Sequence, residues 1–446
     1  MKRNIFNKLI DWKNSPLRKP LILMGARQVG KTWLLKKLGE EEYKNTIYIS
    51  FELNIEYAEI FKRDRNPKRI INELSYLLKI QIKPQETLII FDEIQNAPDV
   101  LASLKYFYEE ANEYHIACAG SLLGITIAKP YSFPVGKVSF INVYPMTFDE
   151  FLGGIGEEFL ANFLKDYNLL EPISTPMFNE LYDKLKLYYI IGGMPEAVLT
   201  YSKNKDLSEI DDILYNLITS YHLDFAKHPS LTEFPKLSAV FNSIPSQLAK
   251  ENKKFLFNLI KTGARAREYE NALEWLINAR IFYKIYRNKS PKLPVSAYDD
   301  ISSFKMYLLD VAILRRLAKL SSYTISEGDR LFTEFKGSLT ENFILEQLIT
   351  QFELPRYWSI INPSHEVDFL IENKNKIIPI EVKSDHNIRS RSLQKYQELY
   401  KDEIKLRIRF SLENLKLDGN FLNIPLFMAS ETKRIIELAN KQLGIN

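Results

Sequence analysis

One stretch near the start of the chain has the residue types and the spacing to bind a phosphate group. It reads Gly25-Ala26-Arg27-Gln28-Val29-Gly30-Lys31-Thr32. Two glycines separated by four residues, followed at once by Lys and Thr, form the pattern of a phosphate-binding loop. Its backbone N–H groups would surround the phosphates at the positive end of a helix, Lys31 would reach the β- and γ-phosphates, and the Thr32 hydroxyl would ligate Mg²⁺. We therefore predict that these eight residues bind ATP with Mg²⁺ and that Lys31 takes part in catalysis.

Polar residues at the ends of two apolar stretches complete the predicted nucleotide site. Residues 87–91 read Thr-Leu-Ile-Ile-Phe and run directly into Asp92 and Glu93. Downstream of a phosphate-binding loop, we expect Asp92 to hold Mg²⁺ and Glu93 to act as the general base that polarises the attacking water. Ser121 follows the next apolar stretch, where it would sense the γ-phosphate or hold the water. The alternative for Ser121 is an ordinary turn serine.

A third set of polar residues lies in the last part of the chain. Asp368 lies in an apolar stretch, Glu381 and Lys383 end the next stretch as Glu-x-Lys, and Glu341 lies in a preceding helical segment. Residues two apart in a strand share a face, so Glu381 and Lys383 point the same way. This set follows the PD-(D/E)xK nuclease pattern, in which Asp368 and Glu381, with Glu341, would bind Mg²⁺ and Lys383 would position or activate water. A structural ion pair between Glu381 and Lys383 is the alternative.

Alternating strands and helices must position the first two groups. Apolar stretches predict strands at residues 21–24, 46–50, 87–91, 115–119 and 138–143. Helical spacing predicts helices after the loop, over 67–82 and over 98–112. This alternation indicates an α/β fold, the doubly wound parallel sheet of a P-loop NTPase, over residues 1–155.

The middle of the chain reads mainly as helices. Helices predicted over 159–167, 177–191 and 207–226 would form a helical lid of residues 156–230. Residues 231–332 suit a winged helix-turn-helix, with helices at 236–241, 254–260 and 266–279 and a strand at 281–286. Residues 333–446 would then form a restriction-endonuclease-like α/β domain around the Asp368 and Glu381 strands.

The charge distribution suggests a partner for the winged-helix region. Residues 224–332 hold 18 Lys/Arg against 11 Asp/Glu, a net of +7, whereas the whole chain carries +4. Arg265 and Arg267 begin the third helix, which would enter the DNA major groove. The basic excess therefore predicts DNA as a partner. A winged helix used only for packing or for contacts between copies is the alternative.

Composition places the chain among ordinary globular proteins. Hydrophobic residues make up 46% and charged residues 26% of its 446 residues. The one cysteine, Cys118, excludes an internal disulfide and a cysteine-based metal site. No apolar run approaches the length needed to cross a membrane. We expect a soluble, cytoplasmic protein without a membrane partner.

The motifs together resemble a family of bacterial and archaeal AAA-like ATPases that end in a nuclease-like domain of unknown function. They lie at residues 25–32, 91–95, 119–123, 145–151, 192–195, 304–310, 366–368 and 381–383. The resemblance covers nearly the whole chain and implies an N-terminal ATPase, a middle winged helix and a C-terminal restriction-endonuclease-like domain. Where the family often has Gly-Arg before its last core strand, this chain has Gly136-Lys137, and lysine lacks the planar fork of an arginine finger.

These observations lead to three hypotheses. In the leading one, a DNA-associated ATPase uses hydrolysis to move the winged helix or the nuclease-like domain. In the first rival, ATP binding is a regulatory switch that controls homo-oligomerisation or a protein partner, and the nuclease-like domain is inert. In the second rival, ATP licenses an active Mg²⁺-dependent nuclease.

Overall fold

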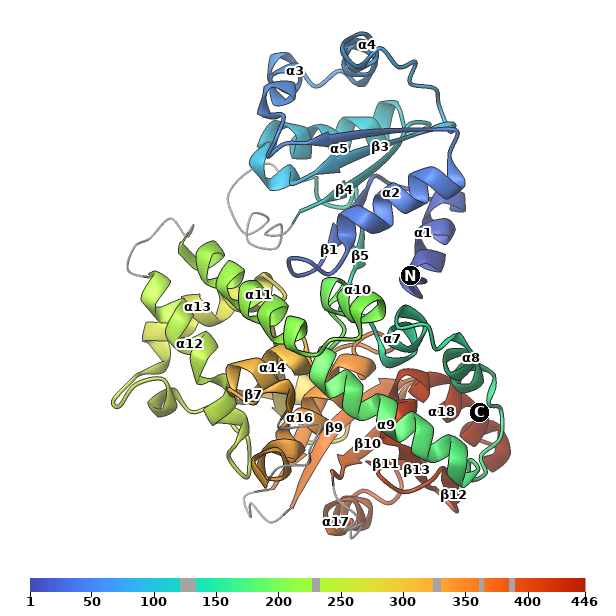
Figure 1. Ribbon diagram of the computed structural model, residues 1–446, viewed down its shortest axis with the longest axis vertical. Helices are drawn as coiled ribbons and strands as arrows, with labels where there is room; N and C mark the ends of the chain where they lie inside the picture. Colours follow the sequence, from blue (N-terminus) through green and yellow to red (C-terminus); the bar gives the residue numbers. More distant parts are fainter. Residues whose placement is uncertain (121–133, 227–232, 324–329, 361–364, 385–389, 446) are drawn as a thin grey trace. The chain divides into compact units, whose positions relative to one another are not determined.

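Two units make up this computed structural model, which describes residues 1–120, 134–226, 233–323, 330–360, 365–384 and 390–445. The N-terminal unit comprises Lys2–Tyr144 and Asn278–Ile281. The C-terminal unit comprises Met1, Pro145–Ile277 and Phe282–Asn446. Figure 1 shows the elements of both units in chain order.

Five parallel strands form the sheet of the N-terminal unit, in the order β2-β3-β4-β1-β5. They are β1 (Leu21–Met24), β2 (Asn45–Ser50), β3 (Thr87–Asp92), β4 (His115–Ala119) and β5 (Ser139–Asn142). Every residue of β3 and β4 is buried, as expected for central strands covered on both faces. The α/β fold with a parallel sheet that the sequence predicted for this part of the chain is confirmed.

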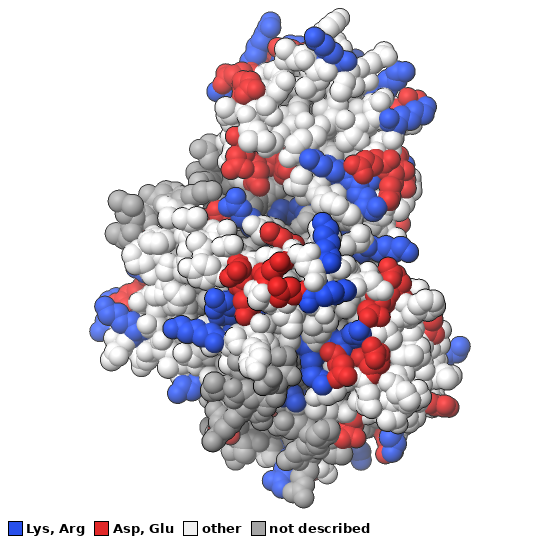
Figure 2. All heavy atoms as spheres, viewed as in Figure 1, with Lys and Arg blue, Asp and Glu red and all other residues white. Residues whose placement is uncertain are grey.

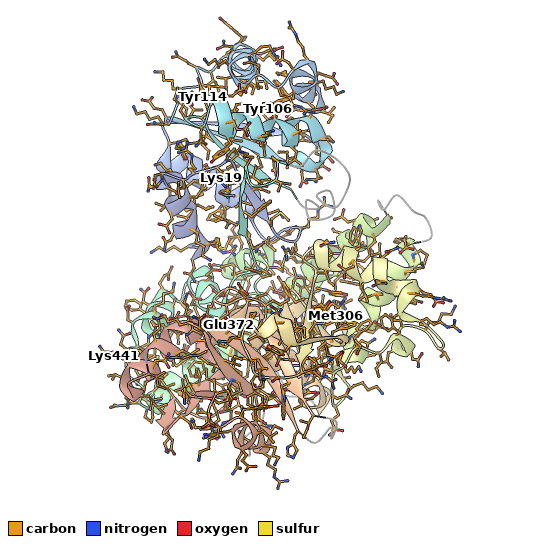
Figure 3. All side chains as sticks on the ribbon, turned by 180° about the vertical axis from the view of Figure 1, so that it is seen from behind. Lys19, Tyr106, Tyr114, Met306, Glu372 and Lys441 are labelled. Atoms are coloured by element: carbon orange, nitrogen blue, oxygen red, sulfur yellow. The ribbon has the colours of Figure 1, made fainter. Side chains whose placement is uncertain are left out.

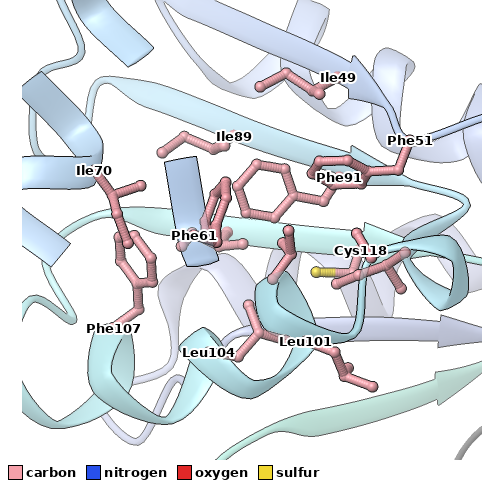
Figure 4. Close-up of a cluster of buried hydrophobic side chains, with 14 of the residues drawn as sticks. Ile49, Phe51, Phe61, Ile70, Ile89, Phe91, Leu101, Leu104, Phe107 and Cys118 are labelled. Atoms are coloured by element: carbon pink, nitrogen blue, oxygen red, sulfur yellow. The ribbon is translucent and has the colours of Figure 1, made fainter. Parts of the chain in front are cut away.

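Helices cover both faces of this sheet. They are α1 (Ile5–Asn14), α2 (Lys31–Glu42), α3 (Glu59–Arg63), α4 (Pro67–Leu78) and α5 (Pro98–Glu110), with the 3-10 turns η1 (Ile55–Ala58) and η2 (Ile94–Asn96). Ile47 and Ile49 of β2 face a core that α3, α4 and α5 complete (Figure 4). Tyr48, between them, faces α2 instead, where the Lys36 Nζ lies 3.9 Å from the centre of its ring. The phosphate-binding loop thus leads into a helix on the face opposite that core.

Eleven described helices belong wholly or mainly to the C-terminal unit. They are α7 (Phe148–Gly154), α8 (Glu158–Asp166), α9 (Thr175–Ile191), α10 (Pro195–Asn204), α11 (Ser208–Ala226), α12 (Glu233–Leu248), α13 (Ala266–Asn278), α14 (Val311–Leu317), α16 (Arg330–Leu348), α17 (Arg391–Leu399) and α18 (Thr432–Leu443). The 3-10 turns are η3 (Phe257–Leu259), η4 (Val295–Tyr298) and η5 (Leu426–Glu431).

An eight-stranded mixed sheet lies in the same unit, in the order β12-β13-β11-β10-β9-β8-β6-β7. Its strands are β6 (Phe282–Asn288), β7 (Asp299–Leu308), β8 (Arg356–Ser359), β9 (Glu366–Asn373), β10 (Lys376–Val382), β11 (Arg407–Ser411), β12 (Lys416–Asp418) and β13 (Phe421–Pro425). The antiparallel pair β6–β7 joins the sheet through two parallel partners on β8, Tyr357 and Trp358. Strands on both sides of residue 333 therefore share one sheet.

The helices at the start of the predicted winged-helix region differ from expectation. In place of short helices at 236–241 and 254–260, α12 runs without a break over Glu233–Leu248, and the second segment contains only the 3-10 turn η3. The helix continues past Pro245 because Val240, Ile244 and Leu248 bury one continuous apolar stripe. The predicted helix over 67–82 is also too long, since Lys79 takes a left-handed conformation and ends α4 at Leu78.

Candidate functional site

The phosphate-binding loop connects β1 to α2 through a backbone that requires glycine. Gly25 and Gly30 have φ angles of 154° and 93°, a region that side chains disfavour. A Cβ on Gly25 would also overlap the carbonyl oxygen of Val143. Helix α2 begins at Lys31, so the backbone N–H groups of its first turn face the loop. The sequence pattern therefore folds into a concave run of backbone at the start of a helix.

Lys31 is held inside this loop. Its Nζ donates hydrogen bonds to the carbonyl oxygens of Gly25 at 2.9 Å and Ala26 at 2.6 Å. Burial lowers the pKa of Lys31 to about 8, although the charges of Glu93 and Asp92 act in the opposite direction. The ammonium group is thus desolvated and held by neutral carbonyl groups, which phosphate oxygens can replace with full negative charge.

The carboxylate of Asp92, at the end of β3, meets the start of α2. Thr32 Oγ1 donates a hydrogen bond to Asp92 Oδ2 at 2.8 Å. The backbone N–H of Glu93 donates to Asp92 Oδ1 at 3.0 Å. The structure therefore brings together Thr32 and Asp92, the two residues that the sequence assigned to Mg²⁺.

Tyr48 also reaches Asp92, and the sequence did not predict this. Its phenolic OH donates to Asp92 Oδ2 at 2.9 Å from the neighbouring strand β2. Burial, followed by the hydrogen bond and the charge of Asp92, raises the pKa of Tyr48 to about 12, so the phenol stays a neutral donor. The sequence feature that could have indicated this contact is the position of Tyr48 in β2, two residues before the end of a strand that we placed in the parallel sheet.

Glu93, the predicted base, has an unusual backbone. Its φ of 48° and ψ of 44° lie in the left-handed region, which costs a non-glycine residue about 1 kcal/mol or more. Its Oε2 accepts a hydrogen bond from Gln95 Nε2, whereas Gln95 Oε1 is buried without a hydrogen-bond partner in the described part of the chain. Strain of this kind is common at functional sites, where it directs a side chain.

Two further residues complete the N-terminal candidates. Ser121 lies outside the described residues, although β4, which precedes it, does lie between β3 and β1. Lys137 forms an ion pair with Glu109 at 3.0 Å and lies over the ring of Tyr108. The described structure therefore ties Lys137 to α5 of its own unit.

Among the predicted nuclease residues of the C-terminal unit, Glu341 lies on α16, Asp368 on β9 and Glu381 on β10, and Lys383 directly follows the end of β10. Asp368 Oδ2 accepts a hydrogen bond from the backbone N–H of Val382 at 2.8 Å. The Nζ of Lys383 lies 2.8 Å from Glu381 Oε1, and Glu381 Oε2 is buried without a hydrogen-bond partner among the described residues. Burial and then the charge of Glu341 raise the pKa of Asp368 to about 8. This contact is the ion pair between Glu381 and Lys383 that we named as the alternative to a nuclease site.

Two lysines that the sequence did not single out enter this acidic group. Lys305, on β7, is fully buried and forms an ion pair with Glu366 of β9. Lys253, between α12 and α13, forms an ion pair with Glu341 Oε1, and the Tyr307 OH donates to Glu341 Oε2 at 3.0 Å. Figure 3 labels Met306, the residue of β7 between Lys305 and Tyr307.

The lysines change the electrostatics of the site. Burial disfavours the charged form of Glu341, but Lys253 and Lys305 outweigh it and hold its pKa below the ordinary value. Burial likewise disfavours charged Lys305, yet Glu366, Glu341 and Asp368 raise its pKa above the ordinary value. Across the described residues, no group of three or more His, Cys, Asp or Glu side chains is placed to hold a metal ion. In this arrangement lysine side chains already pair with Glu341 and Glu366.

The residues of the proposed DNA-reading helix are accessible. Arg267 is exposed in the first turn of α13, and Arg265 is exposed directly before it. The antiparallel pair β6–β7 follows α13, and β6 also pairs with β8, so this pair forms one edge of the eight-stranded sheet.

Three parts of the sequence match models of known families. Residues 17–152, which include the phosphate-binding loop, match an AAA domain. We call this segment the AAA-like P-loop domain. Residues 182–324 match a domain of unknown function, DUF8612, and residues 336–427 match another, DUF4143. The amino-acid sequence matches no curated protein.

Several solved structures show a distant likeness to the chain. A Walker-type ATPase of Pyrococcus abyssi is 17% identical, with 71% of this chain and 95% of that chain covered and a TM-score of 0.43. PCH-2 of C. elegans is 14% identical, with coverages of 48% and 65% and a TM-score of 0.27. Cdc6p of Pyrobaculum aerophilum is 15% identical, with coverages of 72% and 92% and a TM-score of 0.24.

The donors in the AAA-like P-loop domain fit Mg²⁺. A hydroxyl and a carboxylate are hard oxygen ligands, and Thr32 and Asp92 hold them 2.8 Å apart beside the start of α2.

None of the described helices is long and apolar enough to cross a membrane.

Proposed function

We propose that the protein is a Mg²⁺-dependent ATPase and that its nucleotide site lies in the AAA-like P-loop domain. The observation that carries the proposal is the hydrogen bond of 2.8 Å between Thr32 Oγ1 and Asp92 Oδ2, which joins the phosphate-binding loop to the carboxylate strand. An isolated glycine turn would not need a buried lysine beside it and a carboxylate at the end of the buried strand β3.

Each residue of the site has a distinct part in this proposal. The backbone N–H groups of residues 25–32 bind the phosphates, and Lys31 leaves its carbonyl partners to bind the β- and γ-phosphates. Thr32 and Asp92 would hold Mg²⁺, which would supply positive charge next to the phosphates. Glu93 accepts a proton from the attacking water. Ser121 retains its predicted role beside the γ-phosphate.

Separate variants test binding and hydrolysis. Lys31→Ala should abolish ATP binding, because the loop loses the cation that faces the phosphates. Glu93→Gln should bind ATP as tightly as the wild type and hydrolyse it at least about 100-fold more slowly, since it loses the general base. Glu113→Gln, on an exposed residue of the same unit, is the matched control. A normal turnover number in Glu93→Gln would remove Glu93 from the base role, and unchanged ATP affinity in Lys31→Ala would overturn the nucleotide site.

The ion pairs of Lys305 and Lys253 support a second proposal, in which the nuclease-like fold is inert and the ATP cycle acts as a regulatory switch. Two lysine charges pair with Glu366 and Glu341, two carboxylates whose charges act on Asp368. In this proposal the lysines supply the positive charge that a metal ion would otherwise supply. Both lysines come from residues outside 336–427, the segment that matches DUF4143. A restriction-endonuclease-like fold for that segment, and control of homo-oligomerisation by ATP, are parts of this proposal.

A cleavage assay separates the inert domain from an ATP-licensed nuclease. The full chain is incubated with single- and double-stranded DNA and Mg²⁺ or Mn²⁺, with and without ATP. We expect no cleavage by the wild type and no difference in Asp368→Ala. Cleavage that Asp368→Ala abolishes would replace the regulatory switch with the nuclease.

Association with DNA is the third part of the proposal, and it rests on the exposed Arg265 and Arg267. On the face shown in Figure 2, basic and acidic side chains are interspersed. The double substitution Arg265→Gln/Arg267→Gln should weaken DNA binding and lower the slope of log affinity against log salt by about 2. Unchanged binding would favour a winged helix that serves only for packing.

A further inference from the structure

The Asp92 carboxylate receives one hydrogen bond that nucleotide chemistry does not explain. Thr32, one of its donors, is itself a predicted ligand of Mg²⁺, and its hydroxyl must turn a lone pair to the metal. The Glu93 N–H binds the other carboxylate oxygen from the same peptide segment. The donor left over is Tyr48, whose OH lies 2.9 Å from Asp92 Oδ2.

The position of Tyr48 follows from the sheet. Strands β2 and β3 are parallel neighbours, with Ser50 paired to Asp92 and Tyr48 paired to Ile90. Tyr48 therefore starts about 7 Å along the strand from the level of Asp92, since each residue rises about 3.3 Å. A phenol spans that distance, whereas Ser or Thr at the same position would be too short. The side chain is long enough, and points to the correct face, to reach the metal ligand.

The ring of Tyr48 is itself supported from α2. The Lys36 Nζ lies 3.9 Å from the ring centre, a cation–π distance. Lys36 belongs to the helix that Lys31 and Thr32 begin, so one helix contributes the phosphate ligand, the metal ligand and the support of the tyrosine ring. The orientation of the phenol is therefore fixed relative to the Mg²⁺ site.

We propose that Tyr48 is a positioning residue of the Mg²⁺ site, which acts through Asp92. Its OH holds Oδ2 in one orientation, so the carboxylate would already be ordered when a metal ion binds. A carboxylate without this donor rotates about its Cβ–Cγ bond and must be ordered when the metal binds. Residues that orient metal ligands in this way commonly contribute about 10- to 100-fold to metal affinity. This inference rests on the proposed ATPase function.

Tyr48→Phe tests the inference, because it keeps the ring over which Lys36 lies and removes only the donor. Tyr76→Phe makes the same chemical change at a residue that is 84% exposed in the same unit, and it is the matched control. Mn²⁺ binding to the protein–ATP complex, followed by electron paramagnetic resonance, should weaken about 10-fold in Tyr48→Phe and remain unchanged in Tyr76→Phe. Binding of a fluorescent ATP analogue without divalent metal should match the wild type in both variants.

The outcomes separate this inference from the proposed function. A wild type that binds ATP and Mn²⁺ while Tyr48→Phe binds Mn²⁺ equally well would overturn the role of Tyr48 alone. Weaker metal-free nucleotide binding in Tyr48→Phe would assign the tyrosine to structure and also overturn the role. A wild type that binds no ATP would overturn the ATPase proposal and this inference with it.

Discussion

The Oδ2 atom of Asp310 accepts a hydrogen bond from the backbone N–H of Gly193 at 2.7 Å. The other oxygen of Asp310 accepts from the N–H groups of Ala312 and Ile313 and so caps α14. The neighbouring helix α9 ends at Ile191, and the chain turns at Gly192. Two motifs that carried the family resemblance, residues 192–195 and 304–310, therefore meet inside the C-terminal unit in a structural role.

Gly193 provides the first prediction, because it has no room for a side chain. A Cβ at this position would overlap the backbone carbonyl oxygen of Met146, which cannot move as a flexible side chain would. Gly193→Ala should lower the free energy of unfolding by about 1–3 kcal/mol, the usual cost of overpacking a buried site. Urea unfolding followed by circular dichroism measures the change.

Gly153→Ala is the matched control for Gly193→Ala. Gly153 lies in α7, and no atom is found within 4 Å of its added Cβ. The control should be neutral or should stabilise the protein by up to about 1 kcal/mol, since alanine favours a helix over glycine. Equal free energies of unfolding in the two variants would contradict the close approach of Gly193 to Met146.

The buried ion pair of Lys305 and Glu366 gives the second prediction. Lys305→Met leaves Glu366 charged and largely buried without its partner, so we expect a loss of about 3 kcal/mol in the free energy of unfolding. Adding Glu366→Gln should restore most of the stability, because the unpaired charge is gone. Lys416→Met, at an exposed pair with Asp418, should change stability by less than about 1 kcal/mol. Additive losses in the double variant would show that the two residues do not interact.

What could be predicted from the sequence depended on whether the chemistry was local. The phosphate-binding loop is eight consecutive residues, and Asp92 directly follows an apolar strand, so both follow from short patterns. Tyr48 and Asp92 are 44 residues apart, and Lys305 and Glu366 are 61 apart. Such contacts depend on strand order and on which face a side chain occupies, which no local spacing specifies.

The acidic set of the C-terminal unit shows the same limit in another way. The Glu-x-Lys spacing predicts that Glu381 and Lys383 point the same way, and their side chains lie 2.8 Å apart, although β10 ends at Val382. It carries no information about Lys253 and Lys305, which enter from earlier segments and neutralise the neighbouring glutamates. A motif therefore predicts which groups a strand carries, whereas the distant residues around it decide their charge balance.

Gln95 gives the third prediction, through its contact with the predicted base. Its Nε2 donates to Glu93 Oε2 and so limits the orientations of that carboxylate. Gln95→Leu should lower kcat for ATP hydrolysis about 10-fold and leave ATP affinity unchanged, because Glu93 contacts water and not the bound phosphates in our proposal. Steady-state kinetics together with nucleotide titration separates the two effects. A rise in KM at unchanged kcat would instead place Gln95 in nucleotide binding.

His115 gives the last prediction, which concerns the dependence of stability on pH. His115 is 4% exposed, and its Nδ1 lies 2.6 Å from the Tyr43 OH. Burial, with smaller contributions from the charges of Arg18 and Lys13, lowers the pKa of His115 from 6.5 to about 4. The folded state therefore disfavours the protonated form, whereas the unfolded chain takes up a proton as soon as the pH falls below about 6.5.

Because the folded pKa is the lower one, this contribution to stability is complete above about pH 6.5 and is lost as the pH falls toward 4. The wild type should lose roughly 2 kcal/mol between pH 7 and pH 5 from this group alone. In His115→Gln, which does not titrate, that loss should be absent, although the variant is less stable at pH 7. Hydrogen exchange of peptides from β4 during urea unfolding gives the free energy of unfolding of both proteins at pH 7 and at pH 5. An equal loss of stability in wild type and variant would mean that His115 is readily protonated in the folded state.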